Sequence, residues 1–472
     1  MIDIERENDR LLKSTNAISR SRRPSGRFWL YVILFMQSLV AIGQDSHYWN
    51  IQYGTKATLL GGMVIGSVSD LSATYYNPGA ISLFENPKLI ISAKVYEFER
   101  ITIDDGAGLN QDLVSDKIAT APNFFAMKIK MDSTENNKLA ISVLTRQYMD
   151  MNFSTTAITQ GNNPATGAAT TSGYFKGNAY LNEMWGGISF SHKVNENIGL
   201  GVTGYGVYRY QTLMIQSIVE ELETTNQISS YVNFKNIDYT NYRALLKAGL
   251  AVKLQPFTMG LTVTTPSLNV LGSGHFGYGK IINEPDTVAN NVYQTSYQDS
   301  LKTIYKSSWA IGIGAAYWHE KYNIHVSAEW YNAVKDYHPM VVQPFVAQSS
   351  GEIIQKEVNH ELNSVLNFGV GLDYNINKKT SVSGGFTTDY SAKDTDVVSN
   401  ISLTKWNIYH VSAGSNFQIG KTEITLGLSY SFGKNLINQQ VDINNITRFN
   451  NAIKPNVNTE FTRIKLLFGF IF

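Results

Sequence analysis

The last ten residues of the chain read "RIKLLFGFIF" (463–472), and their side chains alternate between two kinds. One set is wholly apolar, whereas the other includes two cations and a glycine. Such a period of two residues is typical of a β-strand, whose successive side chains point to opposite faces. The apolar set comprises Ile464, Leu466, Phe468, Phe470 and Phe472. The chain therefore ends in a strand with one apolar face.

The same alternation recurs upstream, for example in "EITLGLSYSF" (423–432) and "VLNFGVGLDYNI" (365–376). The second face of these segments is small or polar, which a water-facing lumen tolerates and a dry core between two sheets would not. The strands of a soluble β-sandwich show the same alternation, so strand length has to distinguish the two folds. Many segments reach about 10 residues, the length that a tilted strand needs to cross a bilayer, whereas globular strands average about 5–6. The pattern predicts an all-β fold, a transmembrane antiparallel barrel, over residues 88–472.

Short and long connections alternate along this region, as in barrels whose short turns lie on one side of the membrane and long loops on the other. The long polar connections are expected near 102–120, 151–177, 213–239, 265–303, 340–361, 392–402 and 435–460. The strands are expected near 88–101, 121–130, 138–150, 178–193, 197–212, 240–254, 257–264, 304–318, 322–339, 362–376, 380–391, 403–418, 422–434 and 461–472. This gives about fourteen strands, with twelve or sixteen as alternatives.

Composition excludes several classes of function. The chain has 472 residues, a formal net charge of +1 and no cysteine, so neither a nucleic-acid partner nor a disulfide is expected. Its eight histidines show no metal-ligand spacing, and there is no nucleophile elbow or phosphate loop. We therefore expect no enzyme activity, no metal and no cofactor. A catalytic site assembled from distant strands is the alternative.

The N-terminus resembles an export signal. Residues 1–27 are polar and end in a basic stretch, and "FWLYVILFMQSLVAIG" (28–43) follows. A basic region, a short apolar region and a small-x-small end are typical of a secretory signal peptide. Sixteen residues fall short of the about 20 that a spanning helix needs. We predict a signal peptide over 1–43, with a short membrane anchor as the alternative.

Residues 44–87 do not alternate and include the glycine-rich stretch "GGMVIGSVSDLSATYYNPGAISLF" (61–84). A barrel of about fourteen strands is wider than one that wall side chains alone can fill. We therefore expect 44–87 to form a plug inside the lumen. A periplasmic tail is the alternative.

This stretch resembles the hatch of the FadL-type transporters, outer-membrane channels for long-chain fatty acids and other hydrophobic compounds. Asp70, Ser72, Asn77 and Pro78 match the hatch motif in spacing, and Gly79 stands where the family has alanine. A looser match covers "GLTVTTPSLNVLG" (260–272). The resemblance implies a monomer in outer-membrane lipid that takes up hydrophobic small molecules passively, with the hatch as its gate.

The family also implies an outer groove near the third and fourth long loops and a lateral exit at a kink in strand three. No glycine or proline in "KLAISVLTRQYMDMNF" (138–153) indicates that kink. Apolar residues of the two predicted loops are candidates for ligand binding, with packing between loops as the alternative. In the third loop, where the spacing is roughly helical, they are Leu213, Met214, Ile218 and Leu222, and in the fourth loop they are Leu268, Val270, Leu271 and Phe276.

Phe468, Phe470 and the terminal Phe472 resemble the signal that the outer-membrane assembly machinery recognises. Two other functions fit the same pattern. A FadL-like barrel can serve as a protein partner or a secretion-system component, for which long polar loops are suited. A polar-solute porin is the third reading, and the predicted plug argues against it.

Overall fold

The computed structural model describes residues 46–84, 88–129, 136–160, 168–224, 226–285, 291–393, 404–420, 422–444 and 455–472. The predicted signal peptide and both predicted boundaries of the plug lie outside these ranges, so the division at 43/44 and 87/88 stays a prediction. No helix in the described ranges is long and apolar enough to cross a bilayer.

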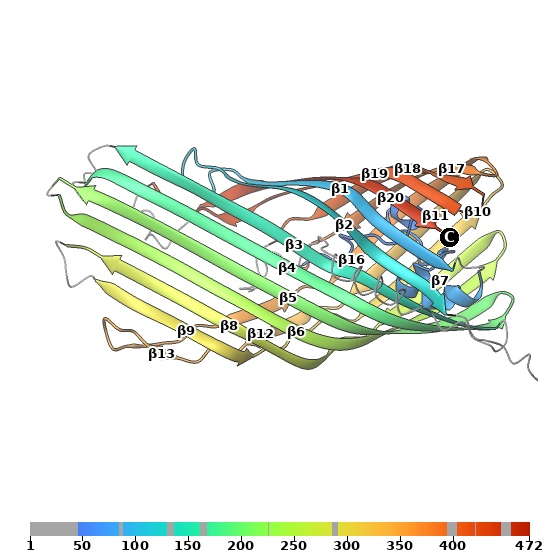
Figure 1. The fold of residues 1–472 in the computed structure, drawn as a ribbon, viewed down its shortest axis with the longest axis horizontal. Helices are drawn as coiled ribbons and strands as arrows, with labels where there is room; N and C mark the ends of the chain where they lie inside the picture. Colours follow the sequence, from blue (N-terminus) through green and yellow to red (C-terminus); the bar gives the residue numbers. More distant parts are fainter. Residues whose placement is uncertain are drawn as a thin grey trace, which may run out of the picture. The chain divides into compact units, whose positions relative to one another are not determined.

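Fourteen antiparallel strands close into a barrel, which confirms the predicted fold class (Figure 1). β1 pairs with both β2 and β20, and the ladder between β5 and β6 completes the ring. The wall strands are β1 (Leu89–Ile103), β2 (Leu113–Ile129), β3 (Asn137–Gln160), β4 (Ala168–Asn195), β5 (Ile198–Glu223), β6 (Ile228–Leu254), β7 (Phe257–Thr264), β10 (Ala310–Trp318), β11 (Tyr322–Tyr331), β16 (Val365–Asn377), β17 (Thr380–Asp389), β18 (Ile408–Ile419), β19 (Thr422–Gln439) and β20 (Asn456–Ile471).

The remaining elements extend or fill this ring. The N-terminal half of β6 pairs with β8 (Leu268–Asn283), which pairs with β9 (Val292–Lys302). β12 (Val334–Met340) pairs with β15 (Val358–Leu362), and β13 (Phe345–Val346) pairs with β14 (Ile353–Ile354). Residues 46–84 contain α3 (Lys56–Leu59), α4 (Ala73–Tyr76) and the 3₁₀ helix η1 (Pro78–Ser82). They pack against the inner face of the wall, and we call them the hatch.

A row of tyrosines marks a change in the strands β3 to β6. Tyr148, Tyr180, Tyr210, Tyr208 and Tyr242 face outward in contact pairs with ring centroids 5.3–5.9 Å apart. Between this row and the end of the barrel that carries the short turns, such as the turn from β4 to β5, the outer face is apolar and the inner face is small or polar. Beyond the row the inner face becomes apolar and the outer face mostly polar. Because an aromatic girdle bounds the apolar band of a membrane barrel, we interpret the row as one edge of that band and the far side as the upper part.

The predicted long loops at 151–177, 213–239 and 265–303 are wrong, because most of these residues continue the strands β3 to β6 or form β8 and β9. The connection between β5 and β6 is confined to residues 224–227. The predicted helical spacing of Leu213, Met214, Ile218 and Leu222 is wrong for the same reason, since all four lie on β5. Above the tyrosine row the outer face meets water, so the polar composition of these strands resembles that of loops.

The connections predicted at 102–120 and 435–460 are shorter than predicted, since β2 begins at Leu113 and β19 runs to Gln439. The connection predicted at 392–402 is longer, because β17 ends at Asp389 and β18 begins at Ile408, and the one predicted at 340–361 contains the short strands β13 and β14. Two predicted strands also differ. The strand expected at 304–318 begins only at Ala310, and the strand expected at 322–339 is divided into β11 and β12. Residues 303–309 are held largely by side-chain bonds: Asn269 Nδ2 donates to Tyr305 O over 3.0 Å, and Ser267 N donates to Ser307 Oγ over 2.9 Å.

Candidate functional site

The Asn77-Pro78-Gly79 turn fixes the hatch to the barrel wall. Asn77 is fully buried, and its Nδ2 donates to Ile65 O and to Leu250 O of β6, each over 2.9 Å. Its Oδ1 accepts from Gly79 N at 3.1 Å and caps η1. A single amide therefore joins the hatch to itself and to the wall.

Gly79 lies where the wall approaches the hatch most closely. A Cβ atom at this position would lie 2.6 Å from Gly249 O and 2.7 Å from Gly199 O, both of them backbone atoms of the wall. Real Cβ atoms do not approach backbone oxygens to such distances. The family's alanine would therefore require the hatch or the wall to shift here, and glycine is the residue that this contact admits.

Asp70 and Ser72 shape the turn before α4. The Asp70 carboxylate accepts from Ser72 N over 2.7 Å and from the Ser72 hydroxyl, and both residues are buried. Gly54 packs against the Ser72 side chain with a φ of 83°, a conformation that favours glycine. Asp70 and Ser72 thus fold the hatch itself, Pro78 begins η1, and Asn77 and Gly79 seat the hatch against the wall.

The first described residues of the hatch are held by β17. Asp389 Oδ1 accepts from Tyr48 N at 3.1 Å and from Trp49 N at 2.9 Å. The other oxygen of this carboxylate, Oδ2, lies 3.4 Å from His47 Nδ1 and 3.7 Å from His410 Nε2. The hatch is therefore anchored near both of its described ends.

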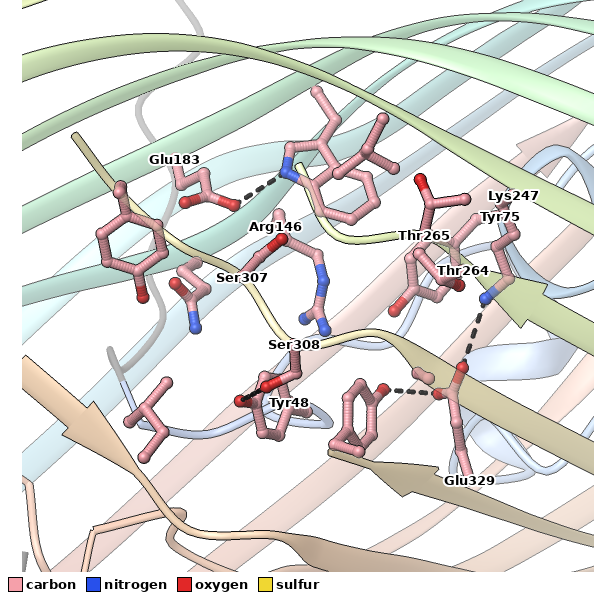
Figure 2. A pocket seen from close by; sticks show the side chains of 17 residues that line it. Tyr48, Tyr75, Arg146, Glu183, Lys247, Thr264, Thr265, Ser307, Ser308 and Glu329 are labelled. Carbon is pink, nitrogen blue, oxygen red and sulfur yellow. Dashed lines mark hydrogen bonds and ion pairs between the residues drawn. The ribbon is translucent and has the colours of Figure 1, made fainter. Parts of the chain in front are cut away.

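A cavity of about 50 Å³ lies between the hatch and the wall (Figure 2). Tyr48 and Tyr75 contribute to it from the hatch, and four charged side chains contribute from the strands. Its lining residues are Tyr48, Tyr75, Arg146, Gln147, Glu183, Trp185, Leu245, Lys247, Thr264, Thr265, Tyr305, Ser307, Ser308, Ala310, Glu329, Tyr331 and Leu362. We call this the charged cavity.

Both carboxylates of the charged cavity are already engaged. Glu183 Oε2 is 2.9 Å from Arg209 Nη1 and 2.5 Å from Arg243 Nη2. Glu329 Oε1 is 3.4 Å from Lys247 Nζ, and Glu329 Oε2 accepts from Trp49 Nε1 at 2.9 Å. Three cations thus pair with two carboxylates. A fourth cation also lines the cavity.

Arg146 is that fourth cation, and it points into the cavity from β3 (Figure 2). It is 6% exposed and forms no ion pair with a carboxylate in the part of the chain that the structure describes. Its guanidinium lies 5.8 Å from the ring centre of Tyr75 and 5.6 Å from that of Trp185. Its Nη1 atom has no hydrogen-bond partner. Because a buried charge is costly unless it is paired, the cavity favours an anion.

A larger, apolar cavity of about 160 Å³ lies in the upper part of the barrel. Strands β1 to β5 supply most of its lining, and Trp406 and Val441 complete it. The lining residues are Ile103, Gly106, Leu113, Met151, Phe153, Phe175, Gly177, Asn178, Ala179, Leu213, Ile215, Trp406 and Val441. We call this the apolar cavity. The lumen therefore offers an apolar space in its upper part and a cationic one between the hatch and the wall.

The predicted ligand-binding residues divide between the two faces of the wall. Leu213 lines the apolar cavity, and Phe276 is buried in the same apolar cluster. The others lie on the outer face of β5 or are exposed on β8, with Leu268 as much as 75% exposed: Met214, Ile218, Leu222, Leu268, Val270 and Leu271. The structure does not bring these six into either cavity.

The charged residues of the cavity were not predicted from the sequence. Each lies on the less apolar face of its strand, whereas the predictions rested on the apolar face. Arg146 and Lys247 lie within the predicted strands 138–150 and 240–254. A cation on the small, polar face of a membrane strand points into the lumen, so strand parity could have identified both. No feature of the sequence shows that Arg146 lacks a partner.

Among the described residues of the wall, one stretch between β2 and β3 shows no backbone ladder. β2 and β3 pair from Phe124↔Leu144 to Ile129↔Leu139, and above this point β2 pairs only with β1. Pro122, which has no N–H to donate, lies just beyond the last pair, and β3 shifts register at Thr145/Gln147. Side chains connect the strands instead: Asn152 N donates to Ser115 Oγ over 3.0 Å, and Lys117 pairs with Asp150. We call this stretch the β2–β3 seam.

Neither a protein-family model nor a curated protein sequence matches the chain. Solved structures do. A Pseudomonas aeruginosa FadL homologue is 13% identical, with a TM-score of 0.52, and covers 92% of this chain and 99% of its own. The Pseudomonas putida toluene transporter TodX is 13% identical, with a TM-score of 0.58, and covers 91% and 99%. The Ralstonia pickettii toluene transporter TbuX is 11% identical, with a TM-score of 0.52, and covers 89% and 98%. The resemblance first noted in the hatch therefore extends over the chain: the protein has the fold of the FadL-type transporters.

Proposed function

We propose that the protein is an outer-membrane channel for the passive uptake of hydrophobic small molecules, with long-chain fatty acids as the preferred class. Arg146 is the observation that carries this proposal. It is a buried guanidinium without a carboxylate partner among the described residues, and it lines the cavity between the hatch and the wall. A fatty acid supplies the missing anion and an apolar tail in one molecule.

The lumen is suited to such a molecule. The apolar cavity above would hold an alkyl chain, because moving apolar surface out of water is favourable. The charged cavity below would hold the carboxylate through charge-assisted hydrogen bonds from Arg146. Toluene transporters share the fold, and a compound such as toluene would use the apolar cavity alone.

The β2–β3 seam offers a route out of the lumen. Leu113 and Met151, on the two sides of the seam, both line the apolar cavity. An apolar ligand gains little from crossing a polar lumen and more from re-entering hydrocarbon. We infer that the ligand leaves sideways at the lower end of the β2–β3 seam, beside Tyr148, where the seam reaches the edge of the apolar band and only side-chain contacts have to open. The hatch would then block the route straight through.

Uptake assays test the proposal. The protein would be expressed in a host that lacks its own fatty-acid transporter, and uptake of radiolabelled oleate and of toluene would be compared with that of the empty host. We expect the wild type to restore oleate uptake. Arg146→Met should reduce oleate uptake about tenfold or more, since a charged hydrogen bond is lost, and should leave toluene uptake nearly unchanged.

The same experiment can refute the channel. If the wild type takes up no apolar compound and a protein co-purifies with it, the alternative holds, and the barrel serves as a partner or a secretion-system component. Uptake of oleate that is indifferent to Arg146→Met would instead retain the channel and exclude the proposed site for the carboxylate.

A further inference from the structure

A lysine interrupts the apolar inner face of the upper part. Lys235 on β6 lies next to the buried Ile237 on the same face, and the exposed Asn233 separates it from the buried Tyr231. The neighbour of Lys235 on β5 is Ile215, which lines the apolar cavity, and its neighbour on β8 is Tyr278. The ammonium group therefore stands at the border of an apolar space.

Two further lysines gather at the same place. The Nζ atom of Lys356 lies 4.4 Å from the ring centre of Tyr278. Lys280, two residues beyond Tyr278 on the same face of β8, has its Nζ atom 5.8 Å from the ring centre of Tyr231. Two of the three lysines thus lie over aromatic rings, and one of these rings belongs to Tyr278, the strand neighbour of Lys235.

No carboxylate in the described ranges forms an ion pair with any of the three lysines. Burial, together with the charge of Lys356, lowers the pKa of Lys235 to about 8. Like charges that crowd a partly desolvated site are unfavourable unless an anion joins them. The cluster is therefore short of negative charge.

We propose that Lys235, Lys280 and Lys356 form an outer binding site for the anionic headgroup of an amphiphile, whose apolar tail enters the apolar cavity beside Ile215. The site rests on the proposed function for the class of ligand, but it is separate from the charged cavity. Lys235 and Arg243, which pairs with Glu183 of that cavity, lie roughly 26 Å apart along β6. The outer site would select acids from neutral apolar molecules before they reach the hatch.

Binding to the purified full-length barrel in lipid nanodiscs tests the site, with empty nanodiscs subtracted. The probes are an undecanoic acid with a dansyl group at its tail and the methyl ester of that acid. The measurements use the Arg146→Met background, so that the inner site does not contribute. We expect the acid to bind at least about tenfold more tightly than the ester, as a charged hydrogen bond would provide.

Adding Lys235→Met and Lys356→Met should remove this preference for the acid. Lys235→Arg, which retains the charge, should keep it, and so should Lys302→Met, which removes an exposed lysine from β9. The heat-dependent migration of each variant on gels would confirm that its barrel is folded.

Equal affinities for acid and ester overturn the proposal, and so does a preference that survives in the folded double-lysine variant. Failure of the proposed function looks different. Cells would then show no oleate uptake, while the purified barrel still bound the acid through these lysines.

Discussion

Replacing Asn77 by alanine should loosen the hatch without unfolding the barrel. The substitution removes three hydrogen bonds, two of which satisfy Ile65 O and Leu250 O in the interior. A buried group left unsatisfied costs about 1–3 kcal/mol. Leu250 O belongs to a strand that is paired on both sides, so the penalty comes mainly from Ile65 O, and the free energy of the seated hatch should rise by about 1–3 kcal/mol.

Hydrogen exchange measures this change directly. The amides of Thr58 to Ser82 should exchange faster in Asn77→Ala than in the wild type, whereas the amides of β18 and β19 should keep their protection. Asn77→Asp is the matched variant, since it retains the acceptor for Gly79 N and loses both donor bonds. It should therefore show most of the same effect.

The permeability of the outer membrane should increase together with hydrogen exchange in the hatch. Cells carrying Asn77→Ala should become more permeable to polar antibiotics that the outer membrane normally excludes, because a displaced hatch leaves a water-filled lumen. Unchanged exchange in the hatch, within about 0.5 kcal/mol, would refute the reasoning, since a surface substitution has an effect of that size. A uniform loss of protection over the barrel strands would also refute it, because the hatch would then not be a separate unit.

Three other changes have defined outcomes. Gly79→Ala should destabilise the seated hatch by about 1–3 kcal/mol, because its Cβ meets backbone oxygens, and Gly186→Ala, where a Cβ meets nothing within 4 Å, is the control; thermal unfolding and exchange measure both. Arg146→Met should reduce uptake of oleate and spare toluene, as measured by radiolabel transport, whereas equal losses for both compounds would point to a folding defect. Binding of dansyl-undecanoate in the Arg146→Met background should weaken from pH 7 to pH 9, because Lys235 is charged below its pKa of about 8 and loses that charge above it. Lys235→Arg should be insensitive to pH over this range, since arginine keeps its proton; an equal pH dependence in both would contradict the assignment.

The alternation of side chains was enough to predict a membrane barrel with an even number of strands near fourteen. Short turns such as the one between β4 and β5 could be predicted from the sequence, because the strands on both sides of the turn alternate strictly. The upper halves of β3 to β6 could not be read in this way. Their apolar residues face inward and their polar residues face water, so the composition resembles that of surface loops although the period of two persists.

The Asn77-Pro78-Gly79 turn illustrates both what a local pattern predicts and what it does not. Its residue types predict a turn, which depends on local chemistry, and its spacing from Asp70 resembles that of the FadL-type hatch. That Gly79 lies against the backbones of β5 and β6 depends on contacts between residues more than 100 positions apart, which no local pattern encodes.

The sequence by itself determined the class of fold, because the period of two residues acts over a few neighbouring residues. Only the tertiary structure decided which charges remain unpaired. Arg146 and Lys235 look like many other cations along the chain, and it is the closed ring of strands that places them on the inner face, where the neighbouring carboxylates are engaged elsewhere or absent among the described residues. Burial then makes the missing anion costly, and this is the physical reason that both sites point to an acidic ligand.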